Sequence, residues 1–395
     1  MNKLVQINIV CNGSTGRIMC DIAKKAEKEG FQSYIFYGRG NPSKELNCTR
    51  IGNNLSVYFH VFLTRFFNKH GHGSYFATKK LVRELKKITP DIIHLHNIHG
   101  YYINLKILFN YLKYEYKGKI IWTLHDCWSF TGHCTHFTIV ECNKWQGKCY
   151  KCPQVTTYPK AFLIDTSKKE FQTKKKLFTG LNNLTIITPS KWLADLVKKS
   201  FLNEYKIEVI NNGVDLNIFK PTCDERIYKK YNIPKNKKII LGVANIWGER
   251  KGLNDFIELS KIINNEYKIV LVGVNAVDKK KIPANIICVN RTDNAIELAK
   301  FYSAAYCYVN PTYEDNYPTT NIEAISCGTY VISYDTGGCK EQITNNNGLI
   351  IQNRNEKSLA KAIYNFKKTK VKSPNFTIFS KEKKYDEYIK LYSMK

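Results

Sequence analysis

Acidic side chains in the second half of the chain have the types and spacing of a ligand-binding site. The segment EDNYPTTNIEAISCG (314–328) places Asp315 on a loop and Glu323 eight positions later, in the first turn of a predicted helix that Gly328 ends. The dipole of that helix favours a carboxylate by only ~0.3–1 kcal/mol and explains nothing of the loop before it. A carboxylate also accepts two hydrogen bonds from a vicinal diol such as that of ribose. The segment therefore predicts a site for a hydroxyl-rich ligand.

Two cations follow a predicted strand in the segment NIWGERKG (245–252). Arg250 and Lys251 stand where a helix begins, although basic residues usually avoid the positive end of a helix dipole. They suit that place if they hold an anion such as a diphosphate; a solvated basic turn is the alternative. The segment YDTGGCKE (334–341) repeats the order of strand, glycines and helix start, so the loops together predict a sugar-nucleotide site. The further residues predicted to bind the donor at this site are Glu314, Asn316, Tyr317, Thr319, Gly337 and Gly338.

A glycine turn, CNGSTGRI (11–18), follows the first predicted strand. Gly13 and Gly16 permit close approach to the backbone, and the helix N-terminus after them favours an anion. An ordinary strand-to-helix turn explains the same glycines. In the functional interpretation, Gly13 and Gly16 also contribute to donor binding.

Short β-rich runs alternate with helical patterns along the whole chain. Many of them, such as KIIWTL (119–124) and YKIVLVG (267–273), are continuously apolar, which is typical of strands covered on both faces. Repeated β–α units predict an α/β fold with two doubly wound parallel sheets, one per half. We expect an N-terminal domain over 1–205 and a C-terminal domain over 206–372. A terminal amphipathic helix within 373–395 is expected to dock back on the N-terminal domain or on the C-terminal one.

The composition is that of an ordinary globular protein, and the length of 395 residues favours two domains. No apolar run reaches the ~18 residues of a spanning helix, and the N-terminus lacks the order of a signal peptide, so we expect a cytoplasmic protein. The net charge of +28 suits an anionic membrane surface, whereas 52 lysines against 9 arginines argue against readout of nucleic acid. We therefore expect the protein at the inner face of the cytoplasmic membrane.

Motifs of the second half resemble the retaining glycosyltransferases of family 4, which have the GT-B fold. They are INNGVDLNIFKP (210–221), ERKG (249–252), EDNYPTTNIEAISCG and TGGCKE. The resemblance implies two Rossmann-like domains facing a central cleft and a UDP- or GDP-sugar donor. It also implies retention by same-face attack, with no protein nucleophile and no cofactor for catalysis.

The same resemblance implies catalytic roles for Arg250, Lys251 and Glu323, and for one acidic residue of the preceding loop. The family's pair of acidic residues, separated by seven positions, fits Asp315 and Glu323 by spacing. Glu314 is one residue too distant, and the first acidic role stays open between Glu314 and Asp315. The family's usual arginine falls on Ile246, so Arg250 is expected to replace it.

Motifs of the first half resemble enzymes that assemble colanic acid and capsular polysaccharide. This implies a hexosyltransferase that extends a saccharide, linked to a polyprenyl-diphosphate lipid, in the synthesis of capsule, exopolysaccharide or lipopolysaccharide. In the family, a histidine after an N-domain strand contacts the donor sugar, and His125 matches it. His96 and Asp126 are expected on the acceptor side. The motifs are NGSTGRI, PDIIHLHNIHGYYIN (90–104), TLHDCWSFTGHC (123–134) and CPQ (152–154).

Five of the 13 cysteines fall in a predicted insertion over 127–154. Four of them, ending in the close CYKC pair, could supply the thiolates of a structural Zn²⁺ that fixes the loop without doing chemistry. Free thiols and disulfides are the alternatives, and a reducing cytosol argues against disulfides. The predicted ligands are Cys134, Cys142, Cys149 and Cys152, with Cys127, His133 and His136 as substitutes.

The segment LSVYFHVFLTRFFNKHGHG (55–73) is dense in large apolar residues and carries Arg65 and Lys69 near its end. It is too short to span a membrane but suits an interfacial helix, which a lipid-linked acceptor would require. A helix buried in the N-terminal domain is the other interpretation.

Two further functions stay open. A sugar-nucleotide 2-epimerase shares the fold and would convert the donor without an acceptor. A zinc-ribbon nucleic-acid-binding protein, suggested by the charge and the cysteines, would show strongly salt-dependent binding. The scattered lysines argue against this last alternative.

Overall fold

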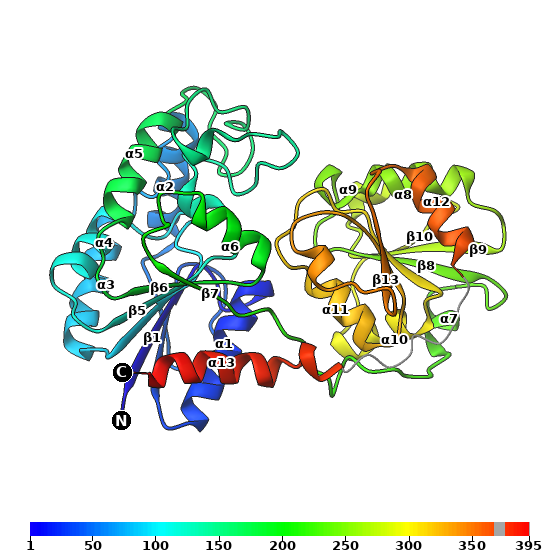
Figure 1. Cartoon of the computed structure of the whole chain (residues 1–395), viewed down its shortest axis with the longest axis horizontal. Coiled ribbons are helices and arrows are strands. Elements are labelled where there is room, and N and C mark those ends of the chain that lie inside the picture. The colour runs from blue at the N-terminus through cyan, green and yellow to red at the C-terminus, as the bar shows by residue number, and fades with distance from the viewer. Residues whose placement is uncertain (367–375, 395) are drawn as a thin grey trace. The chain divides into compact units, whose positions relative to one another are not determined.

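The computed structural model describes residues 1–366 and 376–394, so the predicted end of the second domain at 372 lies outside the described residues. The chain forms two compact units (Figure 1). Unit 1 comprises Met1–Asn211 and Tyr385–Lys395, and unit 2 comprises Asn212–Lys384. Each unit contains a parallel sheet with helices on both faces, which confirms the predicted fold of two Rossmann-like domains.

The described residues of unit 1 form a seven-stranded sheet in the order β3-β2-β1-β4-β5-β6-β7. The chain runs outward from β1 to one edge, then returns beside β1 with β4, so the strand order reverses between β1 and β4. All neighbouring strands pair in parallel. The strands are β1 (Lys3–Asn8), β2 (Gln32–Tyr37), β3 (Cys48–Arg50), β4 (Ile92–Leu95), β5 (Lys119–Thr123), β6 (Leu184–Thr188) and β7 (Lys206–Val209).

Alternate residues of these strands enter two different cores, which is why the strand sequences are continuously apolar. Val5 and Ile93 belong to the larger core on one face, whereas their neighbours Leu4 and Ile92 pack on the opposite face. Asn104 and Ser190 cap two of the covering helices through their side chains. The helices of this unit are α1 (Gly13–Lys28), α2 (Asn54–Phe67), α3 (Tyr75–Ile88), α4 (Leu105–Tyr114), α5 (Ser167–Phe178) and α6 (Lys191–Lys198), with the short 3₁₀ helices η1 (Trp128–Phe130) and η2 (Lys144–Gln146).

The described residues of unit 2 form a six-stranded parallel sheet in the order β10-β9-β8-β11-β12-β13. Its order reverses between β8 and β11, in the same way as in unit 1. The strands are β8 (Lys238–Val243), β9 (Tyr267–Val272), β10 (Ile287–Val289), β11 (Cys307–Asn310), β12 (Val331–Tyr334) and β13 (Gly348–Ile351). The helices are α7 (Arg226–Lys230), α8 (Leu253–Ile262), α9 (Ala276–Lys279), α10 (Ala295–Ala304), α11 (Thr319–Ser326) and α12 (Glu356–Asn365), with the 3₁₀ helices η3 (Glu249–Lys251), η4 (Cys339–Glu341) and η5 (Phe376–Phe379).

The predicted division after residue 205 is wrong by one strand. We expected KIEVI (206–210) to open the second domain, but β7 pairs in parallel with β6 at the edge of the first sheet. The short helix α6 connects the two strands and completes one more β–α–β unit of unit 1. The boundary therefore falls after Asn211.

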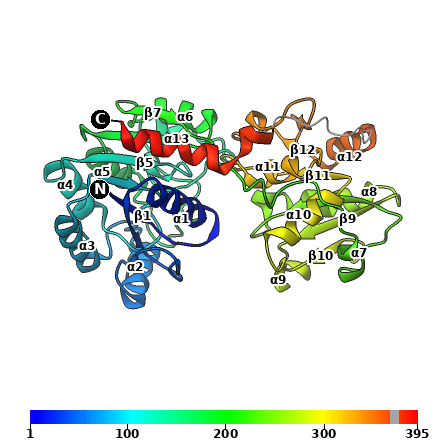
Figure 2. The same cartoon turned by 90° about the horizontal axis from the view of Figure 1, so that it is seen from below.

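The last helix, α13 (Lys381–Ser393), ends on unit 1, as Figure 2 shows. Tyr385, Tyr388, Leu391 and Tyr392 are buried in the same core as Leu4 of β1. These side chains recur at helical spacing, so one face of α13 covers the sheet. Among the described residues, no helix is long and apolar enough to cross a membrane.

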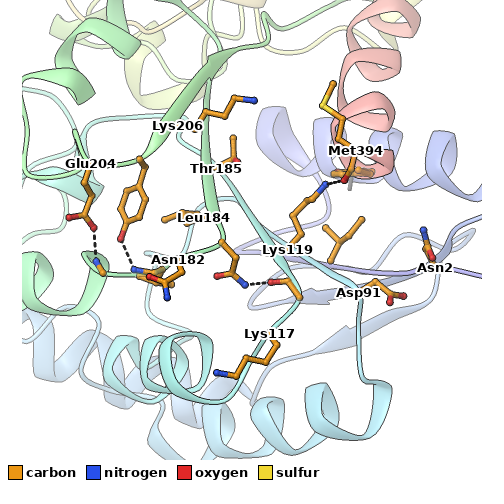
Figure 3. A pocket seen from close by; sticks show the side chains of 17 residues that line it. Asn2, Asp91, Lys117, Lys119, Asn182, Leu184, Thr185, Glu204, Lys206 and Met394 are labelled. Carbon is orange, nitrogen blue, oxygen red and sulfur yellow. Dashed lines mark hydrogen bonds between the residues drawn. The ribbon is translucent and has the colours of Figure 1, made fainter.

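A cavity of about 1060 Å³ lies at the amino ends of the unit 1 strands, next to the end of α13 (Figure 3). The amino group of Lys119 crosses it and donates to the carbonyl oxygens of Leu391, at 2.9 Å, and Met394. A cation at the C-terminal end of a helix satisfies unpaired carbonyls and opposes the negative end of the dipole. Ligands of doubly wound sheets bind at the opposite, carboxyl ends of the strands. We therefore interpret this cavity as the place where Lys119 holds the end of α13, and not as a ligand site.

Candidate active site

The predicted donor residues of unit 2 come together where its strand order reverses. The loop after β8 carries Arg250 and Lys251, and the loop after the neighbouring strand β11 carries Asp315. Gly337 and Gly338 follow the next strand, β12. Carboxyl ends of parallel strands on either side of such a reversal form the usual ligand crevice of this architecture. Three segments separated by many residues in the sequence therefore converge on one site.

Lys251 and Asp315 are joined directly, by an ion pair between Nζ and Oδ2. Both side chains are partly buried, with about a fifth of each exposed, 22% for Lys251 and 19% for Asp315. Limited contact with water strengthens the interaction of such charges with each other and with an arriving anion. Asp315, rather than Glu314, contacts the predicted phosphate-binding lysine through its side chain.

Arg250 braces the loop that carries the acidic residues. Its guanidinium donates to the carbonyl oxygen of Glu314 at 3.1 Å, and its own carbonyl oxygen accepts from the backbone of Tyr313 at 2.9 Å. Thr312 adds a hydroxyl bond to the same Arg250 carbonyl at 3.1 Å. The Glu314 side chain is 5% exposed and lies inside the unit. Arg250 thus positions the 312–314 loop, in addition to bringing a positive charge to the site.

Glu323 lies in α11 and is held by a neighbour that the sequence did not point out. The hydroxyl of Tyr302, on α10, donates to Glu323 Oε2 at 2.9 Å. Burial, with the charge of Glu323 beside it, raises the pKa of Tyr302 well above its ordinary value, so the hydroxyl keeps its proton. Glu323 is 8% exposed, and the bond from Tyr302 fixes its orientation.

A chain of buried amide groups supports the loop between Asp315 and α11. Asn310 donates to Asn321 at 2.8 Å, Asn321 donates to Gln342 at 2.9 Å, and Gln342 donates to the carbonyl of Pro318 at 3.0 Å. A fully connected network of this kind is rigid, because a rearrangement would leave a buried polar group unpaired. The loop that holds Asp315 is therefore fixed from both sides.

The glycine pair after β12 lies against the same loop. A Cβ atom on Gly337 would stand 1.9 Å from the carbonyl oxygen of Asp315, and its φ of +53° is in the left-handed region. Gly338 donates its backbone N–H to the carbonyl of Asn316 at 2.8 Å. The structure therefore gives both glycines a packing role against the predicted sugar-binding loop. The structure places Tyr317 in the core of unit 2 at 6% exposure, and Thr319 at the start of α11.

The predicted residues of unit 1 gather at its own strand-order reversal. Gly13 and Gly16 open α1 after β1, and His96 and His125 follow β4 and β5. Gly13 has a φ of +71° with open space around it, whereas a Cβ on Gly16 would lie 2.5 Å from the backbone of Cys11. Close packing of the turn therefore explains Gly16, and Gly13 provides the left-handed turn.

A row of hydrogen bonds sets the protonation of His125. Gln6, inside β1, gives its amide N–H to the carbonyl of Met19 at 3.2 Å, which leaves its Oε1 to accept from Nε2 of His96 at 3.0 Å. With Nε2 protonated, Nδ1 of the neutral His96 accepts, at 3.2 Å, from Nε2 of His125. Burial lowers the pKa of His125 to about 4, so the ring is uncharged near neutral pH. His125 is therefore a neutral ring that donates from Nε2 to His96 and is held in place by the row of bonds that starts at Gln6.

Asp126 faces a different partner. Its Oδ2 lies 2.9 Å from Nε2 of His99, and Nδ1 of His99 lies 3.0 Å from the hydroxyl of Tyr158. Burial works against ionisation of Asp126, but the charge and hydrogen bond of His99 prevail and lower its pKa to about 2. Asp126 also accepts from the backbone N–H of Trp128 at 2.9 Å. Asp126 is thus an ionised anchor of the loop after β5.

The cysteine-rich insertion is packed around Phe130, Phe137 and Trp145, and a cavity of about 20 Å³ is lined by all four predicted zinc ligands. No group of three or more His, Cys, Asp or Glu side chains within residues 1–366 and 376–394 is arranged to hold a metal ion. Instead, a hydrogen bond between the thiols lowers the pKa of Cys152 and raises that of Cys134. The arrangement does not fit a zinc site as it stands, and zinc stays a prediction from the sequence spacing.

Comparison with known proteins identifies the fold family. Residues 15–218, just over half of the chain, match the family described as Glycosyltransferase Family 4. The chain belongs to glycosyltransferase family 4. Residues 224–390 match a second description, Glycosyl transferases group 1. The boundary between the two matches lies near the observed division at Asn211.

Two curated proteins are similar in sequence to this glycosyltransferase. It is 24% identical over 432 residues, covering 99% of both chains, to the "Putative colanic acid biosynthesis glycosyl transferase WcaC" of Escherichia coli (strain K12). It is 27% identical over 184 residues, 43% of this chain and 47% of the other, to the "N,N'-diacetylbacillosaminyl-diphospho-undecaprenol alpha-1,3-N-acetylgalactosaminyltransferase" of Campylobacter jejuni.

Solved structures share the fold of this glycosyltransferase over nearly its whole length. A sucrose-phosphate synthase from Thermosynechococcus elongatus aligns with a TM-score of 0.72 at 16% identity, covering 99% of this chain and 98% of that one. Anabaena Alr3699/HepE, solved in complex with UDP, aligns with a TM-score of 0.67 at 14% identity over 100% of both chains. These likenesses confirm the predicted GT-B architecture of the family.

Proposed function

We propose that this glycosyltransferase moves a hexosyl group, with retention, from a UDP- or GDP-sugar to a lipid-linked saccharide of a bacterial surface polysaccharide. The observation that carries the proposal is the placement of Lys251 and Asp315 beside each other at the strand-order reversal of unit 2, with Glu323 on the following helix. The relative WcaC, named for colanic acid biosynthesis, supports the polymer class. The Campylobacter relative, named for an undecaprenol-linked acceptor, supports the lipid carrier.

The chemistry of the donor assigns a task to each charged group. When the bond between the sugar C1 and the phosphate oxygen breaks, negative charge grows on the departing diphosphate, and Lys251 with Arg250 neutralises it. The acceptor oxygen bonds to C1 on the same face, and its proton passes to a departing phosphate oxygen. Asp315 holds hydroxyl groups of the sugar, and Glu323 accepts from the two ribose hydroxyls.

Lys251 is paired with Asp315 in the structure. When the diphosphate binds, Lys251 exchanges Asp315 for a phosphate oxygen. Because the Lys251 side chain is already held in place, little side-chain entropy is lost on binding. The exchange also releases Asp315 Oδ2 from the ion pair, so that it can accept from hydroxyl groups of the sugar.

The proposal is tested by a donor screen followed by transfer. Thermal unfolding is measured with UDP, GDP and ADP, and the nucleotide that raises the transition is supplied as its sugars together with a polyprenyl-diphosphate-linked saccharide. Transfer with an unchanged anomeric configuration, read by NMR, supports the proposal. An epimerised sugar nucleotide from donor alone supports the 2-epimerase instead. Tight oligonucleotide binding with no nucleotide-sugar effect would overturn both.

Replacing Glu323 by glutamine should weaken binding of the donor nucleotide by about 10- to 100-fold, because a hydrogen bond to a charged group contributes ~1.5–3 kcal/mol. Titration calorimetry with the nucleotide measures the change. Tyr302→Phe removes only the bond that orients Glu323, so a smaller loss, about 2- to 10-fold, is expected. Unchanged affinity in Glu323→Gln would place the ribose elsewhere.

A further inference from the structure

Helix α2 of unit 1 exposes its apolar face to solvent, whereas a surface helix of a globular protein usually buries that face. Its buried residues are Val57, His60 and Thr64, so its inner face is largely polar. Its outer stripe, at the spacing of one helical face, consists of large apolar side chains. These are Leu55 (77% exposed), Tyr58 (69%), Phe59 (60%), Phe62 (47%), Phe66 (41%) and Phe67 (44%).

Specific bonds hold α2 in this orientation. His60 lies 3.0 Å from the hydroxyl of Ser74 through Nδ1 and accepts from the backbone N–H of Gly71 at 3.0 Å through Nε2. Thr64 bonds back to the carbonyl of His60 at 2.9 Å. Both nitrogens of the His60 ring are used, so a rotation that buried the aromatic stripe would leave this ring without partners at a buried place. The exposure of the stripe is therefore fixed by the fold.

A second segment, about 100 residues later in the chain, extends the apolar surface. Phe162 donates its backbone N–H to the carbonyl of Arg65 at 2.8 Å, and its ring lies 6.2 Å from that of Phe66. Leu163 and Ile164 follow, 73% and 47% exposed. We call the outer face of α2 together with residues 162–164 the aromatic surface. Figure 2 shows α2 at the margin of unit 1.

The surroundings of the aromatic surface are cationic. Between Glu45 and Glu84 the sequence contains no acidic residue, and Arg65 and Lys69 are exposed at the end of α2. The amino group of Lys160 lies 5.0 Å from the ring of Phe162. The nearby Asp165 is engaged, because its carboxylate accepts from the backbone N–H groups of Cys152 and Ser167 at 2.8 Å each.

We propose that the aromatic surface docks unit 1 on the surface of an anionic lipid bilayer, with α2 lying in the plane of the headgroups. A helix with an aromatic outer stripe and flanking lysine and arginine side chains has the chemistry of an interfacial helix. The cations meet anionic headgroups while the rings enter the boundary of the acyl chains. A second copy of the chain fits less well, because two cationic rims would then face each other. The exposure of the apolar side chains of α2 contradicts the interpretation of the segment 55–73 as a buried helix.

The experiment sediments the full chain with vesicles of phosphatidylglycerol and phosphatidylcholine in equal parts, and with vesicles of phosphatidylcholine alone. Binding to the anionic vesicles is expected, with a loss at higher salt because the charge contribution is screened. Leu55→Gln with Phe59→Gln should lower the partition coefficient at least ~10-fold, since two large apolar groups no longer leave water. Tyr114→Gln, on an equally exposed aromatic of α4, should change nothing.

Two matched triple variants test the cations around the aromatic surface. Arg65→Gln, Lys69→Gln and Lys160→Gln together should reduce binding by about 10- to 100-fold, since each cation near the surface contributes to adsorption. Lys279→Gln, Lys280→Gln and Lys281→Gln remove the same charge from unit 2 and should retain binding. Equal losses in the two triple variants, or no binding of the wild type, would overturn the proposal.

One outcome would identify a second copy of the chain as the partner of the aromatic surface. If the wild type self-associates in analytical ultracentrifugation, the Leu55→Gln, Phe59→Gln variant is monomeric and neither binds vesicles, the surface joins copies of the chain and the proposal fails. Circular dichroism checks the fold, and the single change Tyr58→Gln replaces the double variant if that one unfolds. Vesicle binding needs neither donor nor acceptor, so a negative result leaves the proposed reaction untouched.

Discussion

Replacing Lys251 by methionine is expected to lower the rate of glycosyl transfer by about 10²–10³-fold, the usual effect of removing one positioned group that stabilises charge in a transition state. Methionine keeps most of the side-chain volume but cannot neutralise the departing diphosphate. The loss should appear in kcat as well as in donor affinity, because the charge on the phosphate is larger in the transition state than in the bound donor. Initial rates at saturating acceptor measure it.

The controls separate the loss of charge from damage to the fold. Lys251→Met leaves Asp315 without its cation, so Lys251→Met with Asp315→Asn tests whether an unpaired carboxylate contributes to the defect. Lys261→Met removes a cation from an exposed pair with Glu258 on α8 and should have no effect on transfer. Transfer by a folded Lys251→Met variant at the wild-type rate would contradict the assignment of the phosphate site.

Spacing within a segment located candidate residues that the structure brings together, whereas their partners from distant segments gave no signal in the sequence. Lys251 and Asp315 were found because each stands after a strand, and the parallel sheet brings such loops together. Tyr302, which orients Glu323, comes from another helix and carries no local signal. Gln6 was detectable in principle, since a polar residue inside the apolar run LVQINIV must have a buried partner.

The fold shows the same contrast between local and global information. Apolar runs located most strands, but they did not reveal which sheet a strand joins, so β7 was assigned to the wrong unit. The short strands β3 and β13 carry only a weak signal of this kind, because CTR is a partly exposed edge segment and the four residues GLII follow an asparagine-rich turn. Periodicity located the apolar stripe of α2 but not its direction, which depends on the bonds of His60.

The distribution of histidines predicts that unit 1 is sensitive to acid and unit 2 is not. All nine histidines lie in the sequence of unit 1. Burial lowers the pKa of His60 and His94 to about 3 and that of His125 and His133 to about 4, and it places those of His70 and His96 well below the ordinary value. Because the unfolded chain binds protons below its pKa of about 6.5 and the folded unit does not, stability is complete above that pH and falls as the pH drops towards 4.

The size of this effect rivals the total stability of a domain. Between pH 7.5 and 5.5 each buried histidine should cost about 1.4 kcal/mol, or roughly 8 kcal/mol for the six, against about 5–15 kcal/mol for a whole domain. We expect the unfolding temperature of unit 1 to fall by about 15–30 °C over this range, while that of unit 2 moves little. Scanning calorimetry resolves the two transitions. Tryptophan fluorescence identifies unit 1, which carries four of the five tryptophans.

One substitution assigns the effect to buried neutral rings. His94 is fully buried and bonded to the hydroxyls of Tyr392 at 2.7 Å and Thr123 at 2.8 Å. His94→Gln should lower stability at pH 7.5 but reduce the difference between the two pH values by about a sixth, since one of six titrating groups is gone. A unit 1 transition that does not depend on pH would mean that these rings are solvated in the folded protein, and the hydrogen-bond row from Gln6 to His125 would then lose its basis.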